Sequence, residues 1–211
     1  MPTPRSPASL ALVISGRRPV VASDGDLARG LVAGEGWAVT ESWRRFAPMV
    51  LMTAERTLGS RAEAEDVAQE VFYRLIRKAK TLRDPDSLRS FVYSFAVRVL
   101  RGELRRRKLR RWFHVQGPDA PETRDLRAMD VEARDVLRRF NALLDRLTPR
   151  DRLVFVLRRM EAMTVDEIAT VMELSVSTVK RAMAHASDRL SSWVDADPGL
   201  SAFAEGKPWG R

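Results

Sequence analysis

The 211-residue sequence contains no cysteine and only two histidines, His114 and His185. The absence of cysteine excludes disulfide bonds, thiolate metal ligands and cysteine nucleophiles, and two histidines leave little for a metal site or a catalytic triad. The chain also lacks a phosphate-binding glycine loop and any apolar run near the roughly 18 residues of a membrane-spanning helix. We therefore expect a cytoplasmic protein with no metal, no cofactor, no catalytic residues and no membrane contact.

Positive charge is in excess, and it is concentrated in one part of the chain. The sequence carries 37 Lys and Arg against 28 Asp and Glu, a formal net charge of +9. Residues 73–113 hold fourteen basic and three acidic residues, a balance of +11, whereas residues 24–72 hold five basic and nine acidic residues, a balance of −4. A solvated helix face usually mixes both signs, so the basic segment favours a polyanionic partner such as nucleic acid.

Apolar residues repeat at helical spacing from Asp24 onward, and no run of useful length has the period of a strand. This pattern predicts an all-α fold. Residues 1–23 contain four prolines and show no lasting period, so we expect a disordered leader. A short hairpin in "LALVISGRRPVV" is the alternative for this segment.

The rest of the chain divides into two small helical domains. Gly117, Pro118 and Pro121 interrupt the helical pattern and indicate a flexible linker. The predicted parts are a first domain over residues 24–113, a linker over 114–128, a second domain over 129–194 and an unstructured tail over 195–211.

Capping signals set the predicted helix starts in the first domain. Ser60 and Glu63 form a capping box that places a helix start at Arg61 in "GSRAEAEDVAQEVFYRLIRKAK". The sequence "RDPDS" then breaks the chain, and Ser87 can cap a long helix from about Leu88 to Trp112. This helix is apolar in its first half and basic in its second half.

The second domain has a similar series of helix starts. "LTPRDRLVFVLRRM" opens with a threonine cap, Thr148, and a proline at the first helical position. Thr164 and Glu167 form a further capping box, and after the short turn "ELS" Ser175 caps a last helix that runs to about Val194. The sequence therefore predicts two short helices joined by a tight turn, as in a helix-turn-helix unit.

The last helix has one apolar and one polar side. The inward stripe on a helical wheel consists of Val176, Val179, Met183, Ala186 and Leu190. The opposite side carries Ser177, Arg181, Ala184, His185 and Asp188, with Thr178 and Lys180 at its flanks. Hydroxyl and cationic groups with small residues between them suit a DNA major groove. An ordinary packed helix pair would show a similar pattern, so the groove stays one of two interpretations at this point.

Two segments resemble a known family. "LTPRDRLVFVLRRMEAMTVDEIATVMELSVSTVKRAMAHASDRL" resembles region 4 of the sigma-70-family transcription initiation factors, and "AEDVAQEVFYRLIRKA" resembles their region 2.2 helix. The order and size are similar to the extracytoplasmic-function (ECF) class, which keeps only regions 2 and 4, and the resemblance covers about residues 24–193. It implies a bacterial factor that binds core RNA polymerase, at the clamp helices of the largest subunit and the flap region, and directs it to promoter DNA.

The same resemblance implies three sets of functional residues. Docking to core polymerase would use Asp66, Gln69 and Glu70. The melted −10 element would be held by Arg83, Ser87, Arg89, Arg98, Arg101, Arg105, Arg106, Arg107 and Lys108. The −35 element would be read by Ser175, Ser177, Thr178, Lys180, Arg181 and His185.

Two departures from the family pattern affect the −10 set. Phe91 stands where a tryptophan is usual, and Arg98 stands where the frequent "ARN" triplet has asparagine. The base preference at the −10 element therefore stays open. So do the promoters used, the inducing signal and the existence of an anti-sigma factor. The competing hypotheses are a dimeric helix-turn-helix repressor or activator that acts without polymerase, and an enzyme.

Overall fold

The computed structural model describes residues 22–112 and 131–204, and all secondary structure in these two ranges is helical. The predicted all-α fold is thereby confirmed. The alternative hairpin, most of the expected leader and the expected linker over 114–128 lie outside the described residues, so the proposed boundaries stay predictions. No helix in the two ranges has both the length and the apolar character that crossing a membrane requires.

The N-terminal half, residues 22–112, is built on three long helices. Its elements are α1 (Asp24–Ala33), α2 (Gly36–Leu58), α3 (Arg61–Lys78), η1 (Ala79–Thr81), η2 (Pro85–Ser87) and α4 (Leu88–Trp112). Ser23 caps α1 through a capping box with Asp26, so this residue of the expected leader is ordered. The close crossing of α1 and α2 requires Gly30, because a Cβ there would lie 2.6 Å from the Cβ of Ala38.

Two of the predicted caps in this half differ in detail. Ser60 accepts a hydrogen bond from the Glu63 backbone, as predicted. The Glu63 carboxylate does not complete the box but pairs with Arg107. Ser87 does not act as a separate cap, because it lies in η2 and its hydroxyl donates to Asp84, the residue that caps η2.

The C-terminal half, residues 131–204, contains shorter helices. Its elements are α5 (Val131–Leu144), α6 (Pro149–Arg159), α7 (Val165–Met172), α8 (Val176–Asp195) and α9 (Pro198–Ala204). The predicted caps Thr148, Thr164 and Ser175 are confirmed, with a full capping box at Thr164. The expectation of an unstructured tail from residue 195 is wrong for α9, because Leu200 is buried in the core and holds this helix in place.

The predicted apolar stripe of α8 is confirmed with one exception. Val179, Ala186 and Leu190 are buried, and Met183 is half-buried. Val176 is 38% exposed, so its predicted burial was wrong. Val176 is the first residue of α8, directly after the loop that joins it to α7. Ala182, which was not part of the predicted stripe, is buried further along the helix.

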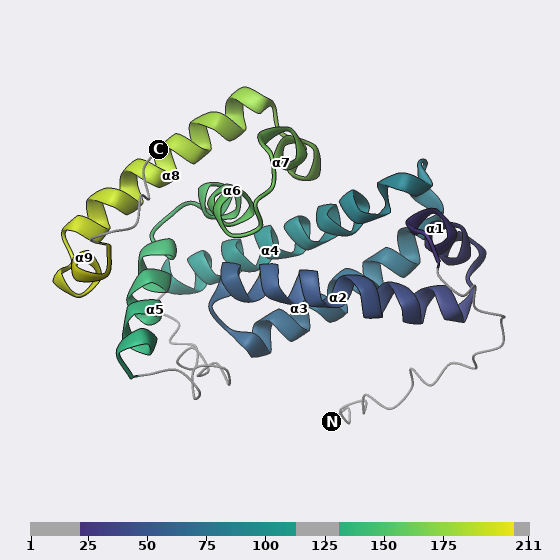
Figure 1. The fold of residues 1–211 in the computed structure, drawn as a ribbon, viewed down its shortest axis with the longest axis horizontal. Coiled ribbons are helices and arrows are strands. Elements are labelled where there is room, and N and C mark those ends of the chain that lie inside the picture. Colours follow the sequence, from purple (N-terminus) through teal and green to yellow (C-terminus); the bar gives the residue numbers. More distant parts are fainter. Residues whose placement is uncertain (1–21, 113–130, 205–211) are drawn as a thin grey trace.

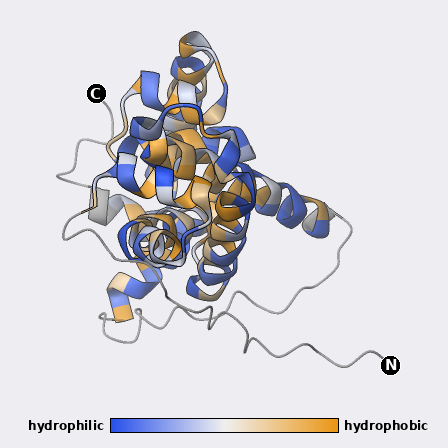
Figure 2. Cartoon of the chain, turned by 90° about the vertical axis from the view of Figure 1, so that its right-hand side faces the viewer, coloured by the Kyte–Doolittle hydropathy of each residue, from blue (hydrophilic) through white to orange (hydrophobic). Residues whose placement is uncertain are grey.

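The two halves pack against each other along α4. This helix lies between α2 and α3 on one side and α6 and α7 on the other (Figure 1). One large cluster of buried side chains includes residues of both halves, from Ala22 to Ala182. A second, smaller cluster joins α6 with α8 and α9 in the C-terminal half alone. Hydrophobic segments are concentrated toward the centre of the molecule in the view of Figure 2, and hydrophilic segments are frequent at its edge.

Candidate functional site

The predicted polymerase-docking residues lie together on the surface of α3. Asp66 and Gln69 are exposed, and Glu70 is half exposed and accepts a hydrogen bond from Arg74 Nε at 2.6 Å. Two exposed apolar side chains continue this face, which we call the α3 stripe: Asp66, Gln69, Glu70, Tyr73 and Ile76.

Tyr73 and Ile76 were missed at the sequence level, although they follow Gln69 at helical spacing of four and seven residues. Tyr73 is 54% exposed and Ile76 is 43% exposed. Exposed apolar side chains that adjoin on one helix face, with acidic and amide groups at the edge, suit a protein-docking face.

The second half of α4 presents part of the predicted −10 set to solvent. Arg105, Arg106 and Lys108 are exposed. Arg106 also forms an ion pair with Glu103 one turn earlier, at 2.5 Å. Three cations on the outer side of one helix can follow the phosphates of a nucleic-acid strand.

Arg107 belongs to the fold and not to this open face. Its side chain is only 15% exposed, and it forms an ion pair with Glu63. Its Nη1 donates to the Leu58 carbonyl at the end of α2 at 2.7 Å. A guanidinium that satisfies the last carbonyls of a helix has its donors committed, so we remove Arg107 from the candidate strand-binding residues.

Arg98 and Arg101, in the middle of α4, face the C-terminal half. Arg98 forms an ion pair with Glu173, and Arg101 Nη2 donates to the Met172 carbonyl at 3.2 Å. Burial lowers the pKa of Arg101, although a guanidinium stays charged at any physiological pH. Two of the residues predicted to hold the −10 strand are therefore paired with the C-terminal half, although Arg98 stays 47% exposed.

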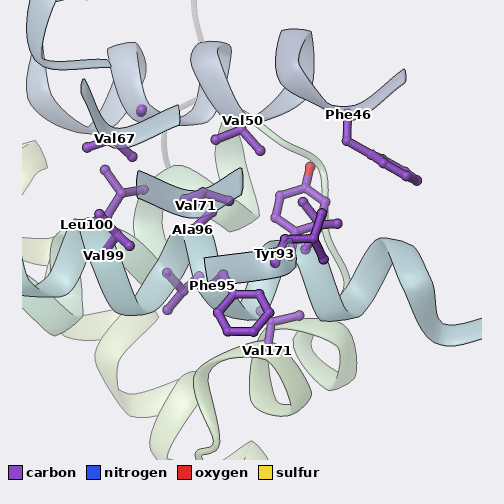
Figure 3. Close-up of a cluster of buried hydrophobic side chains, with 14 of the residues drawn as sticks. Phe46, Val50, Val67, Val71, Tyr93, Phe95, Ala96, Val99, Leu100 and Val171 are labelled. Atoms are coloured by element: carbon purple, nitrogen blue, oxygen red, sulfur yellow. The ribbon is translucent and has the colours of Figure 1, made fainter. Parts of the chain in front are cut away.

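The aromatic residues of α4 are also packed. Phe91 is half-buried and meets Phe95 edge-on, with ring centroids 4.8 Å apart and an interplanar angle of 78°. Phe95 is buried and points toward Val171 of α7 (Figure 3). Phe91 therefore offers only part of its ring for stacking with a base.

The turn before α4 keeps its cations exposed. Arg83 and Arg89 are both on the surface, and the Arg89 guanidinium lies 6.0 Å from the centroid of the Tyr93 ring. The Ser87 hydroxyl donates to the Asp84 carboxylate at 2.6 Å, which lowers the pKa of Asp84. Arg83 and Arg89 are thus available to a phosphate, while Ser87 shapes the turn.

The predicted −35 face of α8 lies open to solvent at its N-terminal end. Ser177, Lys180 and Arg181 are exposed, and Thr178 is half-buried at the flank. The Ser175 hydroxyl is used in capping, because it accepts from the Thr178 backbone N–H at 3.2 Å. The helix N-terminus and two cations together suit phosphate oxygens and base edges.

His185 is held in place by a residue that sequence reasoning missed. Its Nδ1 lies 3.0 Å from Oδ2 of Asp151, a carboxylate that is 1% exposed. Asp151 is the third residue of α6, and its backbone N–H donates to the Thr148 cap. A histidine fixed through Nδ1 keeps Nε2 for a second partner, and His185 is exposed one turn beyond Arg181.

These surfaces combine one protein-docking face with two cationic faces. The α3 stripe is acidic and apolar, whereas α4 and α8 present guanidinium and ammonium groups. Within residues 22–112 and 131–204, no three His, Asp or Glu side chains converge in a way that could hold a metal ion. This arrangement is suited to binding a protein on one face and nucleic acid on the other two.

Two sequence families match the chain. Sigma-70 region 2 matches residues 43–110, and Sigma-70, region 4 matches residues 137–190. The ferric citrate uptake sigma factor FecI of Escherichia coli (strain K12) is 31% identical over 140 residues, which cover 62% of this chain and 76% of FecI. The probable ECF RNA polymerase sigma factor SigI of Mycobacterium tuberculosis (strain ATCC 25618 / H37Rv) is 28% identical over 160 residues, which cover 72% of this chain and about half of SigI, 53%.

Two solved structures have a similar fold. CnrH, in complex with the cytosolic domain of CnrY, aligns with a TM-score of 0.59 and 26% identity over 82% of this chain and 98% of the matched chain. The sigma factor RpoE in complex with the anti-sigma factor NepR from Bartonella quintana aligns with a TM-score of 0.54 over 75% of this chain and 97% of the matched chain. At 15% identity the second alignment supports the fold alone.

Proposed function

The chain belongs to the sigma-70 family as an extracytoplasmic-function (ECF) sigma factor, a transcription initiation factor, and we propose that three of its surfaces divide this work. The α3 stripe binds core RNA polymerase, α4 with the turn before it holds the melted −10 strand, and α8 reads the −35 element. The observation that carries the proposal is the exposed acidic and apolar stripe in a chain whose other two candidate surfaces are cationic.

The docking surface is proposed to bind the clamp helices of the largest polymerase subunit. Asp66 and Glu70 supply negative charge, and Tyr73 and Ile76 supply apolar area that becomes buried on binding. Complementary charge fixes the register of such an interface, and the apolar and aromatic contacts stabilise it. The C-terminal half is proposed to contact the flap region.

The −10 surface is proposed to bind a single strand. Melting DNA costs roughly 1.4 kcal/mol per base-pair step, and each captured base returns about 1–3 kcal/mol. A few captured bases therefore offset a few opened steps. Arg83, Arg89, Arg105, Arg106 and Lys108 add attraction to the strand backbone that weakens as salt rises.

The −35 surface is proposed to enter the major groove with the first two turns of α8. Ser177, Lys180 and Arg181 reach base edges and phosphates, and Asp151 positions His185 for a phosphate contact. A good base contact discriminates by about 1–3 kcal/mol, so each reader alone is weak. Polymerase supplies specificity by holding the two readers at a fixed separation.

Charge reversal on the α3 stripe tests the docking surface. Asp66→Lys with Glu70→Lys should abolish binding to core polymerase in a pull-down, because two attractive contacts become repulsive. The fold should persist, since both side chains are at the surface. Glu132→Lys, an exposed acid of α5, is the matched control and should bind normally. Unchanged affinity of the double variant would contradict the proposal.

A second candidate function is an independent helix-turn-helix regulator. It requires tight promoter binding by the chain alone, whereas our proposal requires core polymerase, and a gel shift with and without polymerase separates the two. We further propose that the chain acts in the cytoplasm without catalysing a reaction of its own. We also propose an anti-sigma partner, because the similar CnrH binds the cytosolic domain of CnrY and RpoE, which has a similar fold, binds the anti-sigma factor NepR.

A further inference from the structure

The imidazole of His185 is bound to a buried carboxylate of another helix. Its Nδ1 lies 3.0 Å from Oδ2 of Asp151, and the Asp151 side chain is 1% exposed while that of His185 is 52% exposed. The other carboxylate oxygen, Oδ1, accepts a hydrogen bond from Arg150 Nε at 3.2 Å. Asp151 also lies in the first turn of α6, where the partial positive charge of the helix N-terminus favours an anion. His185 is therefore fixed against a carboxylate that is held in its ionised form.

This pairing decides which nitrogen of the His185 ring carries a proton. An ionised carboxylate only accepts hydrogen bonds, so Nδ1 must be the donor to Asp151. In a neutral imidazole the second nitrogen, Nε2, then has a lone pair and can only accept, whereas both nitrogens of an imidazolium donate. The neutral ring therefore presents an acceptor to solvent, and the protonated ring presents a donor.

His185 continues an exposed row of side chains on α8. Ser177, Arg181 and His185 are spaced four residues apart, so they lie on one face of the helix with about 6 Å of rise between neighbours. All three side chains are exposed. A DNA backbone that follows this row from Arg181 reaches His185 next. Because phosphate oxygens accept hydrogen bonds, the contact requires a donor on the imidazole.

We propose that His185 binds a DNA phosphate only as an imidazolium, so that binding of the −35 element by α8 takes up one proton and weakens as the pH rises. This inference rests on the proposed −35 role of α8. The proton comes from solvent and binds Nε2, which then donates to the phosphate. In the neutral ring the Nε2 lone pair would face a phosphate oxygen, and two acceptors repel each other.

Asp151 acts as a positioning residue in this contact. It holds the ring through Nδ1, and its negative charge stabilises the imidazolium. An arginine in place of His185 would stay charged at any physiological pH. The histidine thus makes one phosphate contact of α8 dependent on pH.

The charged groups around His185 set the direction of the effect. Asp151 and the phosphate favour the protonated ring, whereas Arg181, one turn earlier on α8, opposes protonation. Arg150 of α6 also opposes it, although this guanidinium is paired with Asp151. Two groups of opposite charge lie one turn later on α8, Asp188 and Arg189.

The other helices packed against α8 are α5, α7 and α9. The sequence of α9 has no charged residue. Within the described parts of the chain, no charged side chain of α5 or α7 is bonded to His185: Glu132, Arg134, Asp135, Arg138, Arg139, Asp166 and Glu167. An imidazole changes charge between about pH 5 and 8, so the DNA affinity should be highest at the lower end of this range.

The test measures binding of the full chain to a short fluorescent DNA duplex of mixed sequence at low salt. A phosphate contact does not depend on sequence, so a mixed duplex is a sufficient probe. Wild type should bind about two- to fivefold more weakly at about pH 8 than at about pH 6, as expected for the loss of one exposed charge contact.

Three variants isolate the contribution of this one ring. His185→Arg keeps a cation at every pH and should remove the pH dependence while binding remains tight. His185→Gln, which has no charge but can still donate to Asp151, should bind weakly over the whole range. The matched control is His114→Gln, which removes the other histidine of the sequence and should keep the full pH dependence.

Nitrogen-15 NMR of His114→Gln, in which His185 is the only histidine, reports the position of the ring proton. The neutral ring should carry its proton on Nδ1, and addition of the duplex should increase the protonated fraction at a given pH. Asp151→Asn should lower that fraction, with a thermal unfolding curve to show that this variant is folded. A neutral ring protonated on Nε2 would contradict the inference, because such a ring donates to phosphate without taking up a proton.

Lys180→Ala with Arg181→Ala separates failure of this inference from failure of the proposed −35 role. The double variant should lower duplex affinity severalfold, because two cations are lost from the exposed end of α8. If it does, but wild type and His185→Arg show the same pH dependence, then the proton-linked contact is wrong and the −35 surface stands. If it does not, then α8 is not a DNA-binding surface, and both proposals fail together.

Discussion

The two cationic surfaces of this protein differ in what they face. Lys180 and Arg181 on α8 are exposed, whereas Arg98 and Arg101 on α4 are bound to the end of α7. Both pairs carry the same charge and were predicted from the same kind of sequence signal. The difference teaches that residue type indicates a candidate nucleic-acid surface, but the packing of other helices decides how much of that surface is open.

Helix polarity explains which surface is covered. The exposed cations of α8 lie in its first two turns, near a helix N-terminus with partial positive charge, which attracts phosphate. The arginines of α4 meet the C-terminal end of α7, whose carbonyl oxygens attract cations. The helix-turn-helix unit therefore leaves the N-terminal end of α8 open to solvent, and its α7 end holds Arg98 and Arg101, which we predicted to bind the −10 strand.

The largest expected effect comes from substitutions that test whether the two buried clusters are independent. Phe155 belongs to the cluster confined to the C-terminal half, and Phe155→Ala should lower the free energy of unfolding of that half by about 3–5 kcal/mol. Leu75→Ala, in the shared cluster, should cost about 2–5 kcal/mol. Hydrogen exchange resolved by segment should be faster in α8 and α9 for Phe155→Ala. For Leu75→Ala it should be faster in both halves. Equal exchange in α3 for the two variants would show that the cores are not separate.

The next effect tests the open surface. Lys180→Ala with Arg181→Ala should reduce transcription from a promoter with an intact −35 element about tenfold or more, at roughly 1–3 kcal/mol per lost contact. Core binding should not change, because α3 is untouched. Arg189→Ala, an exposed cation further along α8, is the control. If the double variant and wild type respond equally to a scrambled −35 element, α8 is not the reader.

The smallest effect compares the same capping device in the two halves. Ser23→Ala and Thr164→Ala should each cost about 0.5–2 kcal/mol of stability, because each removes an N-cap hydrogen bond. Hydrogen bonds from Ser23 lower the pKa of Asp26 to about 2, and those from Thr164 lower the pKa of Glu167. A carboxyl group whose pKa is lowered in the folded state stabilises the fold at pH values above its pKa in the unfolded state, which is 3.8 for Asp26. This stabilisation is lost as the pH falls through the folded-state pKa of about 2.

The capping prediction is checked by following carboxyl signals in an NMR pH titration. Ser23→Ala should bring the pKa of Asp26 back toward 3.8, and Thr164→Ala should raise that of Glu167. Asp135, whose pKa is lowered by Arg139 in α5, should not move in either variant. If the pKa of Asp26 stayed near 2 in Ser23→Ala, then the backbone N–H at position 23 and Arg29 would set it, and not the Ser23 hydroxyl.

Local signals made most of the fold predictable. The caps at Thr148, Thr164 and Ser175 fixed helix starts correctly, because capping depends on residues three positions apart. The helix α9 was missed, although Pro198 at its first position is a start signal, because its docking depends on burial of Leu200 in a core assembled from distant segments.

Availability of the site residues was the part that the sequence did not show. Arg107 and Arg98 look alike in a basic run of the sequence. Arg107, however, donates a hydrogen bond to the last carbonyl of α2 and pairs with Glu63, whereas Arg98 pairs with Glu173, 75 residues away. Such pairs have no periodicity, so no helical wheel identifies them. The same holds for Asp151 and His185, which lie 34 positions apart.

The central claim, that this chain directs core RNA polymerase to promoters through two readers, has one direct test. Core polymerase would be supplied with genomic DNA, with and without the purified protein, and the 5′ ends of the RNA would be sequenced. The account predicts new start sites preceded by two short shared motifs at a fixed separation. With the double variant Lys180→Ala and Arg181→Ala, the start sites should no longer depend on the upstream motif. Start sites identical to those of core polymerase alone would contradict it.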